Sequence, residues 1–289
     1  MSILEETLAA IVPADRAAMD AAWQRWDSIA KPLRSLGLLE EAVVRIAGMT
    51  GTPAVKLGRR AVIAMCADNG VVAQGVTQTG QEVTAIVTEN MSTGDTSVCR
   101  MAAAAGAEVI PVDIGVARAV AGERIRQYNV RRGTADMTQG PAMTREEAVQ
   151  AVETGIELVR ELKDKGYGLI GTGEMGIGNT TTSSALASVF LNRPPEQVTG
   201  RGAGLSSAGL ERKIKAIETA IQVNKPNPAD PLDVLSKVGG LDLAGLCGVF
   251  LGGAACRIPV LVDGFISSAA ALTAARLCPA AVDYMLGSH

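Results

Sequence analysis

The sequence predicts an α/β fold in which a mainly parallel sheet carries helices on both faces and follows an N-terminal helical arm. Three observations support this prediction. Short apolar runs alternate with longer segments of helical periodicity, much of the apolar content is alanine, and the first fifty residues hold helical patterns without a strand. With 289 residues, of which 47% are hydrophobic and only 3% aromatic, the chain can bury a large core.

Helical spacing marks the arm, which we place at residues 1–58. Met19, Trp23 and Trp26 recur at i, i+4 and i+7, and residues 39–46 repeat this spacing after a break at a proline. Both tryptophans fall on one face, which is either ordinary core or a surface that docks on a partner subunit. The arm is therefore a candidate dimer contact.

The body, residues 59–289, alternates predicted strands and helices. A capping box of Thr144 and Glu147 opens one helix, and apolar residues at helical spacing from 210 to 221 mark another. Four apolar runs are the predicted strands: 61–67, 108–116, 167–171 and 258–262. Because ligands of a parallel sheet bind at the carboxyl ends of its strands, we expect one cleft formed by the polar residues that follow three of these runs: 68–70, 171–179 and 263–264.

Composition argues against several classes of partner. The 27 Lys and Arg residues against 30 Asp and Glu give a net charge of −3, and no basic run exceeds two residues. We therefore expect neither nucleic-acid binding nor a polybasic membrane contact. The N-terminus lacks the basic start of a signal peptide, and the apolar stretch 243–256 is too short to cross a membrane. We expect a cytoplasmic protein.

Histidine and cysteine chemistry is largely excluded. The only histidine is His289, the last residue, which removes Ser-His-Asp catalysis, Cys-His catalysis and histidine-ligated zinc. The five cysteines are odd in number, widely spaced and set in apolar segments, as buried free thiols in a reducing compartment would be. Acid–base chemistry therefore falls to carboxylates, and we expect no bound metal or cofactor.

The segment 167–186, YGLIGTGEMGIGNTTTSSAL, is the most informative part of the chain. A strand enters a glycine-rich turn and leaves as a helix that begins with Thr180–Thr182. Backbone N–H groups and the helix dipole at such a turn favour an anion such as phosphate. The alternative is a turn that only closes a tight strand–helix packing.

Two nucleotide motifs almost match this segment. The spacing Gly171-x-Gly173-x-x-Gly176 fits a dinucleotide fingerprint, but prolines at 194–195 stand where a second strand end should be, which argues against an oxidoreductase. The P-loop spacing of 173–178 is followed by Asn179 instead of lysine, which argues against hydrolysis of a nucleoside triphosphate. We therefore expect a monophosphate. Lys213, early in a later helix, is either a further phosphate ligand or a solvated surface lysine.

Several segments together resemble the nicotinate-nucleotide:dimethylbenzimidazole phosphoribosyltransferase family, which activates the lower base of cobamides. They stand in the family's order: Lys31–Glu40, Ala67–Val76, Gln81–Thr84, Arg131–Ala148, Gly173–Thr181, Val198–Leu205, Val238–Gly248, Pro259–Phe265 and the terminal MLGSH. The resemblance implies transfer of 5-phosphoribose from nicotinate mononucleotide to a base, with release of nicotinate and formation of an α-ribotide. It also implies a homodimer, or a heterodimer with a homologous subunit, in which the arm packs on the partner.

The resemblance assigns roles to three groups of residues. Glu174 matches the acid that faces the ribose and the reacting centre. The residues that match the phosphate and nucleotide region are Gly176, Ile177, Gly178, Asn179, Thr180, Gly202 and Lys213. Those that match the border of the lower base are Asp68, Asn69, Gly70, Thr77, Gln81, Glu82 and Met175. Asp242 and Asp263 are candidate supporting residues.

Three departures from the family pattern concern the base. Asn69 stands where the family usually has histidine, residues 77–80 (TQTG) replace an aromatic residue and a proline, and Leu33-Arg34 replaces Pro-Gly. Since flat heterocycles are held by stacking and apolar walls, we expect a base that differs from dimethylbenzimidazole or a broader range of bases, including a purine or a phenol.

The family's general base is a glutamate in a segment that follows the GSH sequence. That position lies beyond His289, so further residues of the chain or a partner subunit would supply it. An alternative function is therefore a non-catalytic or weakly catalytic nucleotide-binding subunit of a paired phosphoribosyltransferase.

Overall fold

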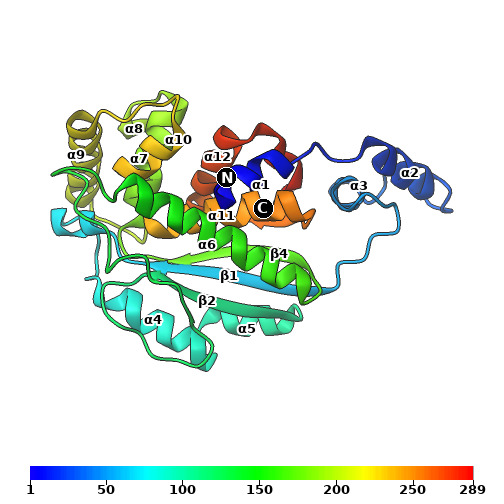
Figure 1. Ribbon diagram of the computed structural model, residues 1–289, viewed down its shortest axis with the longest axis horizontal. Coiled ribbons are helices and arrows are strands. Elements are labelled where there is room, and N and C mark those ends of the chain that lie inside the picture. Colours follow the sequence, from blue (N-terminus) through cyan, green and yellow to red (C-terminus); the bar gives the residue numbers. More distant parts are fainter. Residues whose placement is uncertain (289) are drawn as a thin grey trace.

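The computed structural model describes residues 1–288 and shows a six-stranded sheet in which every pair of neighbours is parallel (Figure 1). The terminal His289 lies outside the described residues. The order of the strands across the sheet is β3 (Arg126–Gln127), β2 (Ala107–Gly115), β1 (Arg59–Ala67), β4 (Tyr167–Met175), β5 (Val260–Val262) and β6 (Met285–Gly287). The predicted α/β class with a parallel sheet is confirmed.

The four predicted strands are present, but the end predicted for β4 is wrong. The strand continues four residues beyond Gly171 to Met175, so the glycine-rich turn begins only at Gly176. Gly171 and Gly173 pair in register with Val62 and Ala64 of β1, and a Cβ atom on either glycine would lie at an ordinary contact distance of 3.4–3.5 Å from the Val62 side chain. The apparent dinucleotide fingerprint is therefore mostly strand.

Helices cover both faces of the sheet, as predicted. On one face lie α4 (Glu82–Thr93) and α5 (Ser97–Ala104), and on the other lie α6 (Arg145–Asp164) and α11 (Leu241–Cys256) (Figure 1). A Cβ atom on Gly248 of α11 would come within 1.9 Å of the Val152 carbonyl of α6, so glycine is what allows these two helices to pack so closely. No helix within residues 1–288 is both long and apolar enough to cross a membrane.

The remaining helices form two sets: a group beside the sheet, and helices that pack near β4 and β5. The group, drawn at the left of Figure 1, consists of α7 (Asn179–Leu191), α8 (Pro195–Val198), α9 (Ser207–Asn224) and α10 (Pro231–Val238). The second set includes α12 (Gly264–Leu277) and the short 3-10 helix η2 (Pro279–Tyr284). Another 3-10 helix, η1 (Gly70–Gln74), follows β1. The capping box that opens α6 is confirmed.

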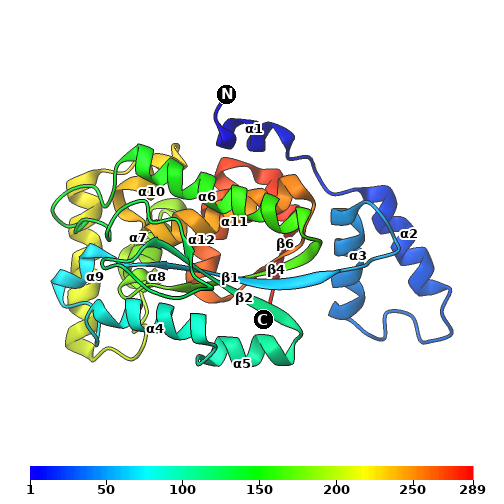
Figure 2. The same ribbon diagram turned by 60° about the horizontal axis from the view of Figure 1, so that its bottom comes forward.

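The N-terminal helices divide between the body and a projection. Helix α1 (Ile3–Ala10) packs on α6 and α11, whereas α2 (Arg16–Asp27) and α3 (Leu38–Thr50) extend to one side as a hairpin (Figure 2). The hairpin has a small core of Ala22, Val44 and Ala47, against which Trp23 and Trp26 pack. The tryptophan face is thus partly used within the arm itself.

Candidate active site

The site lies where the order of strands in the sheet reverses, between β1 and β4. The order β3-β2-β1-β4-β5-β6 places β1 and β4 side by side, with the chain winding away to opposite sides from this pair. In such sheets the carboxyl ends of the two central strands border an open crevice. Here they carry Asp68–Gly70 after β1 and Glu174–Gly176 at the end of β4, so two of the three predicted strand ends meet directly.

An asparagine joins two carboxylates at the centre of this crevice. Asn179, in the first turn of α7, donates from its Nδ2 atom both to Glu174 Oε2 and to Asp242 Oδ2, the latter at 2.9 Å. Asp242 lies in the first turn of α11 and is fully buried, whereas Glu174 is partly buried. The acid predicted to face the ribose thus belongs to a linked set of three side chains.

Burial and like charge perturb both acids. Burial, together with the nearby charges of Asp242 and Asp263, raises the pKa of Glu174 to about 7 against the lowering effect of Asn179. Burial also raises the pKa of Asp242 to about 6. Carboxyl groups whose pKa lies near neutrality can both give and take a proton, which is the property of a general acid or base.

The other end of the crevice offers groups that suit an anion. Gly178 caps α7 with a left-handed backbone, φ +96°, and within residues 1–288 the backbone N–H groups of Gly178 and Thr180 donate no hydrogen bond. Lys213, in the second turn of α9, is only 1% exposed, and its Nζ atom donates to Thr180 Oγ1 at 2.8 Å and to the Gly200 carbonyl at 3.1 Å. The surface-lysine alternative is therefore wrong, and burial lowers the pKa of Lys213 to about 8.

A cavity of about 140 Å³ lies over the start of α7. Its walls come from the loop after η1, from the turn between β4 and α7, and from the loop before α9. The lining residues are Val76, Thr77, Gln78, Thr79, Gly176, Ile177, Gly178, Asn179, Thr180, Arg201, Gly202, Ala203 and Leu205. The cavity thus gathers most residues of the predicted phosphate region together with Thr77.

The remaining residues predicted to border the base are spread around this cavity. Asn69 is fully buried, and neither atom of its side-chain amide has a hydrogen-bond partner of normal geometry within residues 1–288, although the amide faces Asp242 and lowers its pKa. Gln81 donates to the Asn69 carbonyl at 3.2 Å. Glu82 is exposed at the start of α4, and Met175 packs in a small core between the sheet and that helix. These two residues lie outside the set that lines the cavity.

Two further predicted residues lie at the edge of the site. Gly70 donates its backbone N–H to Thr134 Oγ1 at 3.0 Å, and a Cβ atom there would lie 2.5 Å from the backbone of the loop that carries Thr134. Asp263 is exposed at the start of α12, close enough to Glu174 to raise its pKa. Within residues 1–288 no three His, Cys, Asp or Glu side chains are grouped so that they could hold a metal ion.

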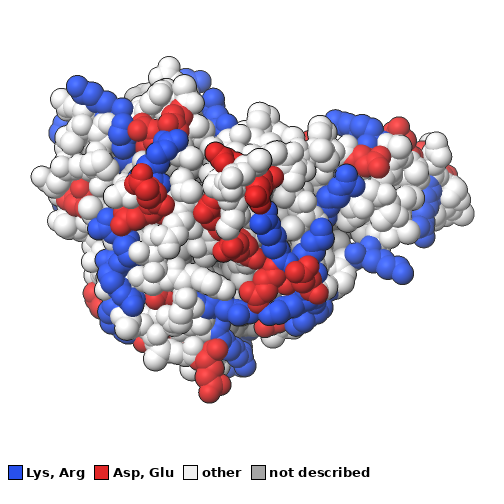
Figure 3. All heavy atoms as spheres, viewed as in Figure 1, with Lys and Arg blue, Asp and Glu red and all other residues white. Residues whose placement is uncertain are grey.

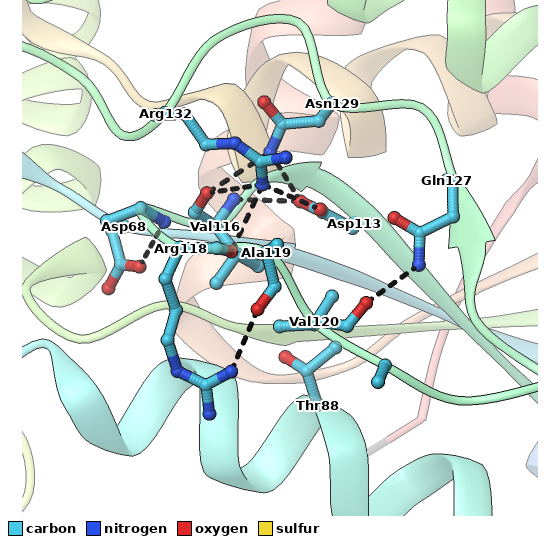
Figure 4. Close-up of polar contacts among 12 residues, drawn as sticks. Asp68, Thr88, Asp113, Val116, Arg118, Ala119, Val120, Gln127, Asn129 and Arg132 are labelled. Carbon is cyan, nitrogen blue, oxygen red and sulfur yellow. Dashed lines mark hydrogen bonds and ion pairs between the residues drawn. The ribbon is translucent and has the colours of Figure 1, made fainter.

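Asp68 belongs to a neighbouring polar network rather than to the cavity. Its Oδ2 atom accepts from the Ala117 backbone at 2.7 Å, beside a cluster in which Asp113 binds Asn129 and Arg132 (Figure 4). This network fastens the long loop after β2 to the end of β1. Elsewhere on the face drawn in Figure 3, charges of both signs are interspersed.

Sequence reasoning missed three residues that shape the site. Thr84 of α4 accepts the Ile177 backbone N–H at 3.1 Å, Thr134 holds Gly70, and Arg201 lines the cavity. All three lie inside segments that carry the family resemblance, so position within those segments was the available signal. Their roles depend on the order of strands in the sheet, and hydrophobic periodicity does not specify that order.

Comparisons with known proteins agree with this geometry. A family model described as phosphoribosyltransferase matches residues 11–289. A nicotinate-nucleotide–dimethylbenzimidazole phosphoribosyltransferase from Acetivibrio thermocellus is 48% identical over 99% of this chain and 82% of its own length, and one from Chloroflexus aggregans is 49% identical over 100% and 82%. The crystal structure of CobT from Thermus thermophilus superposes with a TM-score of 0.90 at 39% identity, covering 94% of this chain and 82% of that one. The chain belongs to the nicotinate-nucleotide:dimethylbenzimidazole phosphoribosyltransferase family.

Proposed function

We propose that this protein transfers 5-phosphoribose from nicotinate mononucleotide to a base that becomes the lower ligand of a cobamide, releasing nicotinate and forming an α-ribotide. The observation that carries the proposal is the convergence, at one crevice, of an anion-binding helix start, a buried lysine and an acid whose pKa lies near 7. Family membership supplies the reaction class, and this convergence supplies groups that suit each part of the substrate.

The phosphate would occupy the start of α7. The unpaired N–H groups of Gly178 and Thr180 and the positive end of the helix dipole favour an anion there. Lys213 supplies the charge, and two of its three N–H donors already fix it to Thr180 and the Gly200 carbonyl, so the third is free for phosphate. A lysine held in this way loses little conformational entropy on binding.

Glu174 would act at the ribose. The departing nicotinate is a pyridinium, which leaves as a neutral ring nitrogen and needs no proton from the enzyme. The carboxylate form of Glu174 would instead stabilise the positive charge that develops on the ribose ring. With a pKa of about 7, a substantial fraction of Glu174 is ionised at neutral pH.

The identity of the accepted base is the more specific part of the proposal. The cavity wall that would face the base is built from Thr77, Gln78 and Thr79, and Gln78 donates to the Gly204 carbonyl at 2.6 Å. Asn69 adds a buried amide that faces Asp242 and has no hydrogen-bond partner of normal geometry within residues 1–288. Such a pocket favours a base with its own polar groups, a purine or a phenol, over dimethylbenzimidazole.

Competition among bases tests this proposal. The chain would be incubated with nicotinate mononucleotide and equal amounts of dimethylbenzimidazole, adenine and p-cresol, and the ribotides measured by mass spectrometry. We expect nicotinate release and a ribotide of adenine or p-cresol at least equal to that of dimethylbenzimidazole. A tenfold preference for dimethylbenzimidazole over both, about 1.4 kcal/mol in transition-state free energy, would refute the altered specificity. No ribotide at all, with the nucleotide still bound, would favour the alternative of a non-catalytic subunit.

We further propose that the hairpin of α2 and α3 contacts a second, homologous chain. The loop that joins these helices and the first turn of α3 have inverted polarity: Glu40 is fully buried and bound to Lys31 at 2.9 Å, whereas Leu33 and Leu38 are 70% and 80% exposed. A segment that buries an ion pair and exposes leucine side chains to solvent suits a protein interface. Light scattering should show a dimer that Leu33→Ser with Leu38→Ser dissociates, and a wild-type monomer would refute this part.

We also place the reaction in the cytoplasm. All five cysteines are free thiols, and burial raises the pKa of Cys66 to about 12, as expected for structural thiols in a reducing compartment. Fractionation of cells that express the tagged protein tests this location.

A further inference from the structure

Asp242 is a buried acid to which the proposed reaction gives no direct role. It is fully buried, it is not among the residues that line the cavity, and no lysine or arginine within residues 1–288 forms an ion pair with it. A buried carboxylate costs several kcal/mol unless charge or hydrogen bonds compensate it. Its presence beside a second acid therefore needs a reason.

The contacts of Asp242 lead to Glu174 through one amide group. Asn179 Nδ2 carries two hydrogens, and the two carboxylates take one each. Because ionised carboxylates only accept hydrogen bonds, the amide must present its nitrogen to both, so its orientation is fixed. Asp242 is itself held by the Leu243 backbone N–H, which donates to Oδ1 at 3.0 Å. The direction of the Glu174 carboxylate thus depends on an anchor in a different helix.

Two glycines make room for this anchor. A Cβ atom on Gly176 would lie 2.4 Å from Asp242 Oδ2 and 3.0 Å from Asn179 Nδ2, and one on Gly240 would lie 2.5 Å from Asp242 Oδ1. Neither position is compatible with a side chain. The backbone on both sides of the carboxylate is therefore adapted to Asp242 as well as to the substrate.

We propose that Asp242 is a positioning residue for Glu174, which it orients through the amide of Asn179 and whose protonation it controls through its negative charge. The inference rests on the proposed function, in which Glu174 acts at the ribose. It predicts that Asp242 affects the reaction only through Glu174, whereas a residue that merely stabilises α11 would affect the fold irrespective of Glu174.

The charged groups around Glu174 agree with this role. Asp242 faces it from α11, Asp263 from the start of α12 and the Cys66 thiol from β1, while Asn179 of α7 is the donor. After burial, Asp242 is the largest cause that raises the pKa of Glu174. None of the ion pairs within residues 1–288 involves Glu174, so no cation offsets these acids.

The first test measures the protonation of Glu174 without any need for turnover. Protein labelled with ¹³C at the glutamate carboxyl carbons would be titrated by NMR, and the Glu174 signal assigned by its loss in Glu174→Gln. In Asp242→Asn, which keeps the shape and an acceptor for Asn179, we expect the pKa of Glu174 to fall from about 7 toward its ordinary value. An unchanged pKa would overturn the proposal even if the protein proved to have another activity.

The second test is a double-mutant cycle on turnover. We expect Asp242→Asn to lower kcat at least tenfold in the wild type but less than twofold in Glu174→Gln. Equal factors in both backgrounds would show a structural role and overturn the proposal. Asp233→Asn is the matched control, because Asp233 also occupies the first turn of a helix, α10, but pairs with Lys237 at 2.9 Å. It should leave kcat and the titration of Glu174 unchanged.

A second variant covers the case in which Asp242→Asn does not fold. Asn179→Ala removes the donor and leaves both acids in place, so the pKa of Glu174 should rise rather than fall, because its ionised form loses a hydrogen bond. A fall or no change in this variant would contradict the bridging role of the amide.

Discussion

Two fully buried aspartates lie at the carboxyl edge of the sheet and meet opposite kinds of neighbour. Asp113, near the end of β2, accepts from Asn129 Nδ2 at 2.7 Å and lies 3.3 Å from the guanidinium of Arg132 (Figure 4). Asp242, at the start of α11, pairs with no cation within residues 1–288, and the amide that binds it also binds a second acid, Glu174.

The difference distinguishes a carboxylate retained for stability from carboxylates retained for chemistry. A cation and hydrogen bonds compensate the burial of Asp113, and the resulting network holds the loop after β2 in place. The acids of the crevice accept hydrogen bonds but have no cation partner within residues 1–288, and burial raises the pKa of Glu174 to about 7. An acid in a strand-end crevice that has no cation partner is therefore a sign of function that an ion-paired acid is not.

The largest expected effect concerns Glu174. If the crevice acids are kept for chemistry, Glu174→Gln should lower kcat by about 10²- to 10⁴-fold, the range for a group that acts on the reacting atoms. Its affinity for nicotinate mononucleotide, measured by calorimetry, should change little, because the phosphate supplies most of the binding. Turnover equal to that of the wild type would assign Glu174 to structure alone.

The next effect concerns Lys213, the buried cation at the phosphate end. Lys213→Ala should weaken binding of nicotinate mononucleotide by roughly 10- to 150-fold, since a charge-assisted contact contributes about 1.5–3 kcal/mol. Lys215→Ala is the control on the same helix, because Lys215 is 75% exposed and paired only with Glu218. Equal affinities for the two variants would remove Lys213 from the site.

A smaller effect is expected at the compensated acid. Asp113→Asn should lower the free energy of unfolding by about 1–3 kcal/mol, because Arg132 and the Val116 N–H lose a charged acceptor. Asp95→Asn, in the exposed pair with Arg100, should cost about 0–1 kcal/mol. The kcat of folded Asp113→Asn should equal that of the wild type, and a large loss of kcat would break the distinction between the two aspartates.

The sequence was sufficient to predict the α/β class and the parallel sheet. Apolar runs of five or more residues predicted β1, β2, β4 and β5, whereas no such run marks β3 and β6, which are two and three residues long. The predicted end of β4 is wrong because glycine usually marks a turn, whereas Gly171 and Gly173 lie within the strand and pair in register with Val62 and Ala64 of β1.

The linkage of Glu174 to Asp242 could not be predicted from sequence. The two acids are 68 positions apart in the sequence. Asp242 reaches Asn179 because α11 packs on β1 and β4 near the carboxyl ends of these strands. The same holds for the hydrogen bond that Asp68 accepts from Ala117 in the loop after β2. Strand order and helix packing decide which polar residues meet, and neither is encoded in local spacing.

The stability of Glu174→Gln as a function of pH tests the central claim most directly. Since the folded pKa of Glu174, about 7, exceeds its ordinary value near 4.5, the folded wild type binds more protons than the unfolded chain between these values and loses stability as pH rises through them. The variant lacks this loss. We predict that its melting temperature, relative to the wild type, increases from pH 5 to about pH 7 and levels off by pH 8. A difference that stays constant or decreases over this interval would show that Glu174 is compensated in the fold, and would contradict the account.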